Sequence, residues 1–198
     1  MGRQSAVVAD CCIQLLWSLR YLLTVFLFAS LSAGAVYAKG VEVKKISSRV
    51  LDGVYRLDVQ LDYQPSDVIL EALEHGVALT FRVNLKVRRK GAWVWENDVV
   101  DWRLRYMLRY HALSSMYELF LPDLKRPQRF ATRDGALRAL GELTNFNLVE
   151  ASRLEADEQY LLRLKVKLDI ESLPVPLRPR AYLSQHWSLS SEQSWPLK

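Results

Sequence analysis

Alternation of apolar and polar side chains is the feature of this sequence that most restricts its fold. Over residues 55–63 every second side chain is apolar, and those between them are charged or carry an amide. The same period of two recurs over 77–88, 100–110 and 160–170. Because successive side chains of a strand point to opposite faces of a sheet, this period indicates antiparallel strands with one face on a core. Shorter strands are predicted at 41–46, 93–95, 116–121 and 129–131.

Two segments interrupt the strand pattern with signals for short helices. Residues 68–75 follow Pro65-Ser66-Asp67 and precede Gly76, which together provide a capped start and a glycine stop. Residues 135–143 follow Thr132 and place leucines at helical spacing. Between the second long strand and Trp93, Lys90-Gly91 predicts a tight hairpin turn.

These patterns predict a mainly β (α+β) fold, an antiparallel β-sandwich-like domain with two short helices. The domain is expected over residues 39–173. After Leu173 the prolines Pro174, Pro176 and Pro179 predict an extended segment rather than a central strand. Trp187 and Trp195 follow in a polar tail, so residues 174–198 are expected to be a C-terminal extension folded back onto the domain.

The N-terminal 38 residues have the pattern of a signal peptide. Arg20 precedes an apolar stretch that becomes rich in small residues and ends in Val36-Tyr37-Ala38. Small side chains at the −3 and −1 positions are what signal peptidase requires, so we expect cleavage between Ala38 and Lys39. The alternative is an uncleaved signal-anchor in the inner membrane, since 22–38 is only slightly short for a spanning helix. Both interpretations predict a domain on the periplasmic side.

The residue types that carry most enzyme chemistry are sparse after Ala38. Both cysteines, Cys11 and Cys12, precede the apolar stretch, and the glycines are too scattered for a phosphate-binding loop. The histidines His75, His111 and His186 lie far apart without metal-ligand spacing. We therefore predict no catalytic residue, no metal and no cofactor. The net charge of +5 is mild, and outside the cytoplasm nucleic acid is an improbable target.

Basic side chains occupy the polar positions of three long strands. Alternation places them on the face away from the core, and they form a patch if the strands are neighbours. One interpretation pairs them across strands with the acids Asp58, Asp62, Asp101, Glu118 and Asp169. The other makes them a surface for an envelope protein or an anionic membrane. The set that we predict as a partner-binding face is Arg82, Lys86, Arg103, Arg105, Arg109, Arg163, Lys165 and Lys167.

Three tryptophans surround the predicted hairpin. Trp102 is expected in the core, because it lies on the apolar face of its strand. Trp93 and Trp95 lie near the turn, where they either pack on the core or form an aromatic contact to a carbohydrate, a lipid or a protein.

Several stretches together resemble a known family. They are ALEHGVALTFRVNLKVRRK, WVWENDVV, RLRYMLRYHALSSMYEL, RFATRDGALRALGEL, LEADEQYLLRLKVKLDIESLPVPLRP and SQHWSLSSEQSW. The family consists of exported Gram-negative proteins and is known as domain of unknown function 4390. The resemblance covers about Val41 to Trp195 and implies a periplasmic domain with a signal peptide. It implies no reaction, cofactor or catalytic residue, but family gene neighbourhoods with an envelope sensor kinase imply a regulatory role. Lys90-Gly91-Ala92 departs from the family, in which another aromatic residue often follows the basic pair.

Three hypotheses for the function follow. The first is a non-catalytic binding or regulatory module that acts on an envelope protein, for example a sensor kinase. The alternative is a lipid or polysaccharide binding protein of the cell envelope, and the third is an enzyme of unfamiliar type. The sequence carries no signal for an oligomeric state.

The signal-peptide pattern gives a first prediction. N-terminal sequencing of the exported protein should begin at Lys39, because signal peptidase cleaves after small residues such as Ala38. A membrane-bound product that retains residues 22–38 would contradict it.

Overall fold

The computed structural model describes residues 40–197 except positions 94, 123 and 125. The predicted signal segment over 1–38 and the predicted cleavage site at Ala38 and Lys39 lie outside these residues. The described part belongs to a unit, Ala38–Lys198, that carries its own hydrophobic core. Among the described residues, no helix has both the length and the apolar character that crossing a membrane requires.

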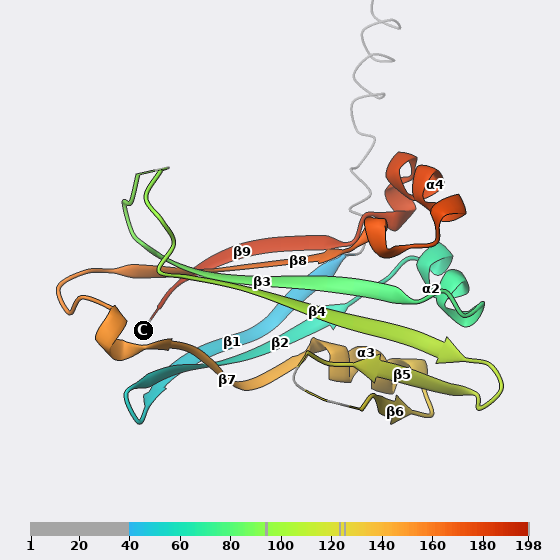
Figure 1. The fold of residues 1–198 in the computed structure, drawn as a ribbon, viewed down its shortest axis with the longest axis horizontal. Coiled ribbons are helices and arrows are strands. Elements are labelled where there is room, and N and C mark those ends of the chain that lie inside the picture. Colours follow the sequence, from blue (N-terminus) through green and yellow to red (C-terminus); the bar gives the residue numbers. More distant parts are fainter. Residues whose placement is uncertain (1–39, 94, 123, 125, 198) are drawn as a thin grey trace, which may run out of the picture. The chain divides into compact units, whose positions relative to one another are not determined.

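Two antiparallel sheets make up this unit (Figure 1). The smaller sheet has the strand order β1-β2-β7, and the larger has the order β6-β5-β4-β3-β8-β9. The strands of the smaller sheet are β1 (Val41–Leu51), β2 (Val54–Tyr63) and β7 (Glu142–Glu150). Those of the larger are β3 (Leu79–Arg89), β4 (Val100–His111), β5 (Met116–Phe120), β6 (Gln128–Phe130), β8 (Tyr160–Leu168) and β9 (Ser190–Pro196). The predicted mainly antiparallel β fold is confirmed.

The core lies between the two sheets. Leu57, Val59 and Leu61 of β2 face inward from the smaller sheet and are buried. They meet the inner face of the larger sheet, where every second residue of β3 from Leu79 to Val87 is buried. Where the sheets meet, the rings of Tyr63 and Phe81 pack edge to face at 5.2 Å. The long-strand predictions from alternation are therefore confirmed to within two residues at each end.

The two predicted helices are present and capped as expected. Helix α2 (Asp67–Glu74) begins after Ser66, whose hydroxyl accepts a hydrogen bond from the Ile69 amide. Helix α3 (Arg133–Gly141) begins after Thr132, whose hydroxyl accepts one from the Gly135 amide. The predicted second helix ran to residue 143, but α3 ends at Gly141 because β7 starts at the next residue.

The region around the predicted hairpin differs from expectation. Lys90 and Gly91 do form a tight turn, in which the Ala92 amide donates to the Arg89 carbonyl at 3.2 Å and Gly91 has a positive φ of 83°. This turn does not lead into a paired strand, however, and the predicted strand at 93–95 is wrong. The register pairs Val87 with Val100, so residues 90–99 have no strand opposite them and form a long connection. Trp102 was also predicted in the core, yet it is 43% exposed. It lies where β4 meets β7, and its indole nitrogen donates to the Leu148 carbonyl at 2.8 Å.

Two strands were missed because their sequences do not alternate. In β7 the residue Asn145 has a positive φ of 55°, and the pairing with β2 shifts register twice. Strand β9 is polar throughout, except at Trp195, and it is held by its pairing with β8. Backbone pairing with a neighbouring strand is open to almost any sequence, so neither strand had a local signal.

The segment after Leu173 is not extended as predicted. It contains the short turns η3 (Val175–Leu177) and η4 (Gln185–Trp187), with the helix α4 (Arg178–Leu183) between them. Pro176 and Pro179 lie in the first turns of η3 and α4, where a missing amide hydrogen removes no helical bond. Trp187 and Leu189 are buried, so the segment packs on the sheets before β9 pairs with β8.

The close approach of α3 to β2 generates a prediction about Gly141. A Cβ at this position would lie 2.1 Å from the Leu61 carbonyl oxygen, so the two backbones would have to separate. Gly141→Ala should therefore lower the free energy of unfolding by about 1–3 kcal/mol, although alanine is the better helix former. Urea denaturation measures this. Arg138→Ala on the exposed side of the same helix is the control, and an equal or higher stability of Gly141→Ala would contradict the packing.

Candidate functional site

The three long strands that carry the predicted basic residues are neighbours, in the order β4-β3-β8. Their register aligns the side chains across the sheet, with Arg105 and Lys167 on either side of Arg82. We call the outward side chains of these strands the basic face, and it consists of Arg82, Lys86, Arg103, Arg105, Arg109, Arg163, Lys165 and Lys167. The structure thus brings the predicted residues together on one surface.

The two closest partners of the basic face that were expected from sequence are Asp169 and Asp101. Asp169 follows β8 and is only 3% exposed, and Arg82 donates two hydrogen bonds to it, at 2.6 and 2.7 Å. Arg105 reaches the same carboxylate at 3.8 Å. Asp101 accepts from Arg103 at 2.7 Å and lies 3.7 Å from Lys86. The hydrogen bond from Arg103 holds the pKa of Asp101 below its usual value.

Three further acids reach the basic face from other elements: Glu118, which was expected to form a cross-strand pair, and Glu192 and Asp98, whose role sequence reasoning missed. Glu118 of β5 is buried between Arg109 at 2.9 Å and Arg129 at 3.1 Å. The hydrogen bond from Arg109, with help from Arg129, lowers the pKa of the Glu118 carboxyl against the effect of burial. An acid within the apolar run Met116–Phe120 was the one sequence signal for this pair.

The two missed acids lie on elements beside the basic strands. Glu192 of β9 is opposite Lys165 and contacts it at 2.6 Å, and Arg163 lies 3.9 Å away. Asp98 comes before β4 and contacts Lys86 at 2.6 Å. The expected pairing of Asp58 and Asp62 with the basic strands is wrong, because these acids pair with Arg49 and Lys44 of β1.

Positive charge nevertheless remains on the basic face, because the acids are shared. Four acids each form ion pairs with two basic side chains: Asp169, Asp101, Glu192 and Glu118. At Asp169, Asp101 and Glu192, one basic group lies 2.6–2.7 Å from the carboxylate and the second lies 3.7–3.9 Å from it. Lys167 has no ion pair within the described part of the chain. The Glu192 and Glu118 clusters each keep one uncompensated positive charge, whereas Asp98 compensates Lys86 beside Asp101, and Glu171 lies 3.9 Å from Arg82 beside Asp169.

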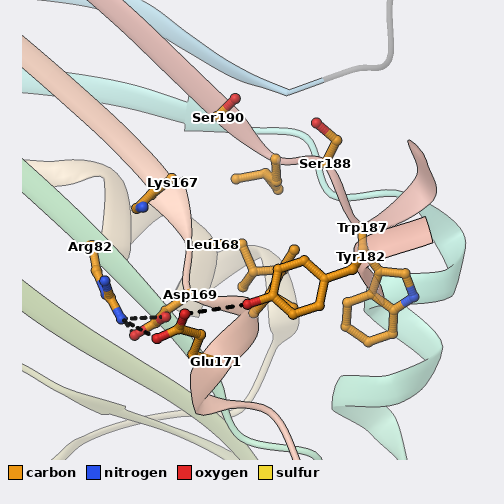
Figure 2. A pocket seen from close by; sticks show the side chains of 11 residues that line it. Arg82, Lys167, Leu168, Asp169, Glu171, Tyr182, Trp187, Ser188 and Ser190 are labelled. Carbon is orange, nitrogen blue, oxygen red and sulfur yellow. Dashed lines mark hydrogen bonds and ion pairs between the residues drawn. The ribbon is translucent and has the colours of Figure 1, made fainter. Parts of the chain in front are cut away.

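Two hollows open on this face, one toward each end of β3. The first has a volume of about 320 Å³ and lies under the C-terminal segment (Figure 2). Arg82 and Lys167 line its charged side, and Trp187, beside Tyr182, lines its apolar side. The Tyr182 hydroxyl donates to Glu171 at 3.4 Å, which closes one end. The hollow therefore offers an apolar wall next to two cations and the two carboxylates of Asp169 and Glu171.

The second hollow lies toward the connection between β3 and β4. Its volume is about 190 Å³, and four of its lining residues are basic against two acidic. The basic ones are Lys86, Arg88, Arg163 and Lys165, and the acidic ones are Asp98 and Glu192. This composition favours an anionic group over a cationic or apolar one.

Trp93 and Trp95, the predicted aromatic contact, lie apart from the basic face. Their side chains are 68% and 79% exposed, so core packing of this pair is wrong. The two rings are stacked on each other at 5.2 Å with an angle of 10° between their planes.

The three histidines serve local structure. His75 caps α2, where its Nδ1 lies 2.7 Å from the Glu71 carbonyl. His111 Nδ1 lies 3.4 Å from the Ser114 hydroxyl in the exposed turn after β4. The His186 backbone carbonyl accepts a hydrogen bond from Ser66. Within residues 40–197, as far as the structure describes them, no group of three His, Cys, Asp or Glu residues is placed to hold a metal ion.

The Arg82–Asp169 pair generates a prediction about stability. Replacing Arg82 by methionine leaves the buried Asp169 carboxylate with only the distant Arg105, so it should lower the free energy of unfolding by about 3 kcal/mol. Arg105→Met should change it far less, because that contact is long and the side chain is largely exposed. Denaturant unfolding of both variants measures the two losses in the free energy of unfolding. Equal losses would show that Asp169 does not depend on Arg82.

Comparison with known proteins places the chain in a family. The family model described as domain of unknown function (DUF4390) matches residues 38–196. No curated protein and no solved structure matches the chain. The matched range includes all nine strands of the two sheets and confirms the resemblance seen in the sequence. Because the match spans most of its 198 residues, the chain belongs to the DUF4390 family of domains of unknown function.

Proposed function

We propose that this protein is an exported, non-catalytic binding module whose basic face holds an acidic segment of an envelope protein. The observation that carries the proposal is the excess of cations over acids on this face: Glu192 and Glu118 are each shared between two cations, and Lys167 has no ion pair within the described residues. Positive charge that no acid compensates is unfavourable for folding when it gathers on one sheet face, because like charges repel. A partner with negative charge relieves that repulsion.

The spacing of the cations suits an extended acidic chain. Neighbouring strands lie about 4.8 Å apart and alternate residues of one strand about 7 Å apart. Lys167, Lys165 and Arg163 follow one another at alternate positions of β8. Carboxylates of a segment that lies along β8 would meet these three cations in turn. The apolar wall of the first hollow, with Trp187, would accept one apolar side chain of the same segment.

Export and a regulatory role belong to the same proposal. The signal-peptide pattern that ends at Ala38 supports export to the periplasm. Family gene neighbourhoods with an envelope sensor kinase suggest the periplasmic part of a sensor as the partner. Non-catalytic action is supported by the histidines, which contact backbone or exposed turn atoms rather than one another.

A second candidate function has one specific observation in its favour. An opening of about 360 Å³ lies between the edge strands β1 and β9, and most of its lining is apolar. Ile46, Leu57, Leu162 and Trp195 line it, and its size lies within the range of small-ligand sites. A lipid chain would fit this chemistry. Binding of a fluorescent fatty acid that is lost in Trp195→Ala, a partly buried lining residue, is the measurement that would favour lipid binding over the basic face.

The basic face is tested by neutralising the cations whose ion pairs are long or absent. Arg105→Gln, Arg163→Gln and Lys167→Gln together leave the close pairs of Asp169 and Glu192 intact. We expect this triple variant to keep its melting temperature but to bind a poly-glutamate peptide at least about fivefold more weakly at low salt. The difference should shrink as salt rises, because the screening length falls to about 8 Å at physiological ionic strength.

The matched control removes the same charge from other surfaces. Lys45→Gln, Arg138→Gln and Arg180→Gln lie on β1, α3 and α4 and are exposed. A photo-crosslinking residue at position 105 should capture an envelope protein in cells, and one at position 138 should not. If the Arg105, Arg163 and Lys167 variant complements a deletion strain as the wild type does and crosslinks the same protein, the basic face is only a solvated surface.

A further inference from the structure

The connection between β3 and β4 carries an exposed pair of tryptophans. We call residues 90–99 the aromatic loop, and it projects beyond the ends of the strands that it joins (Figure 1). Trp93 and Trp95 lie in it with their rings stacked and with 68% and 79% of their surfaces exposed. Large aromatic side chains are usually at least half buried, so this exposure requires an explanation.

The aromatic loop is held in place by contacts to β3. The Arg88 guanidinium donates to the carbonyl oxygens of Trp93 and Glu96, the second at 3.0 Å. The Glu96 amide donates to the Trp93 carbonyl at 3.0 Å, and its carboxylate pairs with Arg89 at 2.8 Å. Such contacts preorganise the loop, so binding through its tryptophans loses little conformational entropy.

The area of the tryptophan pair is small for a protein interface. Each tryptophan can bury roughly 150–250 Å². A stable protein complex needs about 800 Å² on each partner. The pair therefore offers about half of what a protein partner would require. A bilayer surface needs no such area, because insertion of a few aromatic side chains already gives reversible binding when basic residues assist.

The chemistry of the aromatic loop also favours a bilayer. Neither indole nitrogen of the pair has a hydrogen-bond partner among the described residues, so both suit the hydrated interfacial layer, where tryptophan is enriched. The two loop acids, Glu96 and Asp98, are each paired with a cation of β3. Lys90 has no ion pair within the described residues, and its ammonium donates a hydrogen bond to the Gln159 side-chain oxygen at 3.0 Å. A free cation beside an aromatic pair matches an anionic lipid surface.

We propose that the aromatic loop is a membrane-surface anchor: Trp93 and Trp95 insert into the interfacial layer of an anionic phospholipid bilayer, and Lys90 contacts lipid phosphate. The anchor uses Trp93, Trp95 and Lys90, none of which belongs to the basic face, although Asp98 of the loop pairs with Lys86 of that face. It would hold the loop end of the larger sheet at the membrane that bounds the protein's compartment.

Vesicle sedimentation with the domain that lacks residues 1–38 tests the anchor, since that unit has its own core. The domain should bind vesicles of phosphatidylcholine with phosphatidylglycerol. Trp93→Ala with Trp95→Ala should lower the partition coefficient at least about tenfold without changing the melting temperature. The control is Leu113→Ala with Leu183→Ala, two side chains that are 96% and 89% exposed elsewhere, and it should bind like the wild type.

Further arms separate the anchor from the other surfaces. Lys90→Gln should weaken binding to anionic vesicles severalfold and leave binding to neutral vesicles unchanged. Brominated lipids should quench wild-type tryptophan fluorescence, and they should quench it far less in the Trp93 and Trp95 variant. The Arg105, Arg163 and Lys167 variant should retain this quenching. The anchor is overturned if the tryptophan variant binds vesicles as the wild type does, or if the wild type binds lipid-free polysaccharide through these tryptophans but not vesicles.

Discussion

The register of β3 decides which side chains of the larger sheet are buried and which face solvent. This strand lies between β4 and β8, and Phe81, Val83, Leu85 and Val87 on its inner side are almost fully buried. A slip of one residue would move Arg82 and Lys86 into the core, which would cost far more than any surface contact returns. Because the pairing runs through both neighbours, the same register places the cations of β4 and β8 beside those of β3. The register that buries the core residues therefore also places the basic side chains together on the outer face of the larger sheet.

Besides Asp101 of β4, acids reach that face from four other places in the chain. Asp98 precedes β4, Glu118 lies in β5, Asp169 follows β8 and Glu192 lies in β9. Asp169 and Glu118 are buried and anchor two arginines each, which makes them structural. Asp98 and Glu192 are more exposed, and pairs of that kind contribute little to stability. The face is thus stabilised at its buried acids and remains positive between them.

The two proposals use different physical properties of one domain. The basic face acts through charge, and its effect depends on salt. The aromatic loop acts mainly through apolar contact, which salt does not screen. The loop joins β3 and β4, the two central strands of the larger sheet. An anchor at the membrane would therefore fix the orientation in which the basic face meets a partner. Binding at a surface also raises the effective concentration of two weak contacts, so neither needs to be strong alone.

Local patterns in the sequence determined the long strands, their buried faces and the two capped helices, because period-two alternation and the caps at Ser66 and Thr132 act over a few residues. They also identified the cations of the basic face and the aromatic pair. Only the tertiary structure decided that β7 and β9 are strands and that Glu192 and Asp98 pair with cations of other strands. It also decided that β3 and β4 are joined by a long loop rather than by a two-residue turn. The reason is that strand pairing joins backbone groups far apart in the chain, and backbone groups are the same in every residue but proline. A polar segment such as β9 therefore becomes a strand because β8 offers it an unpaired edge.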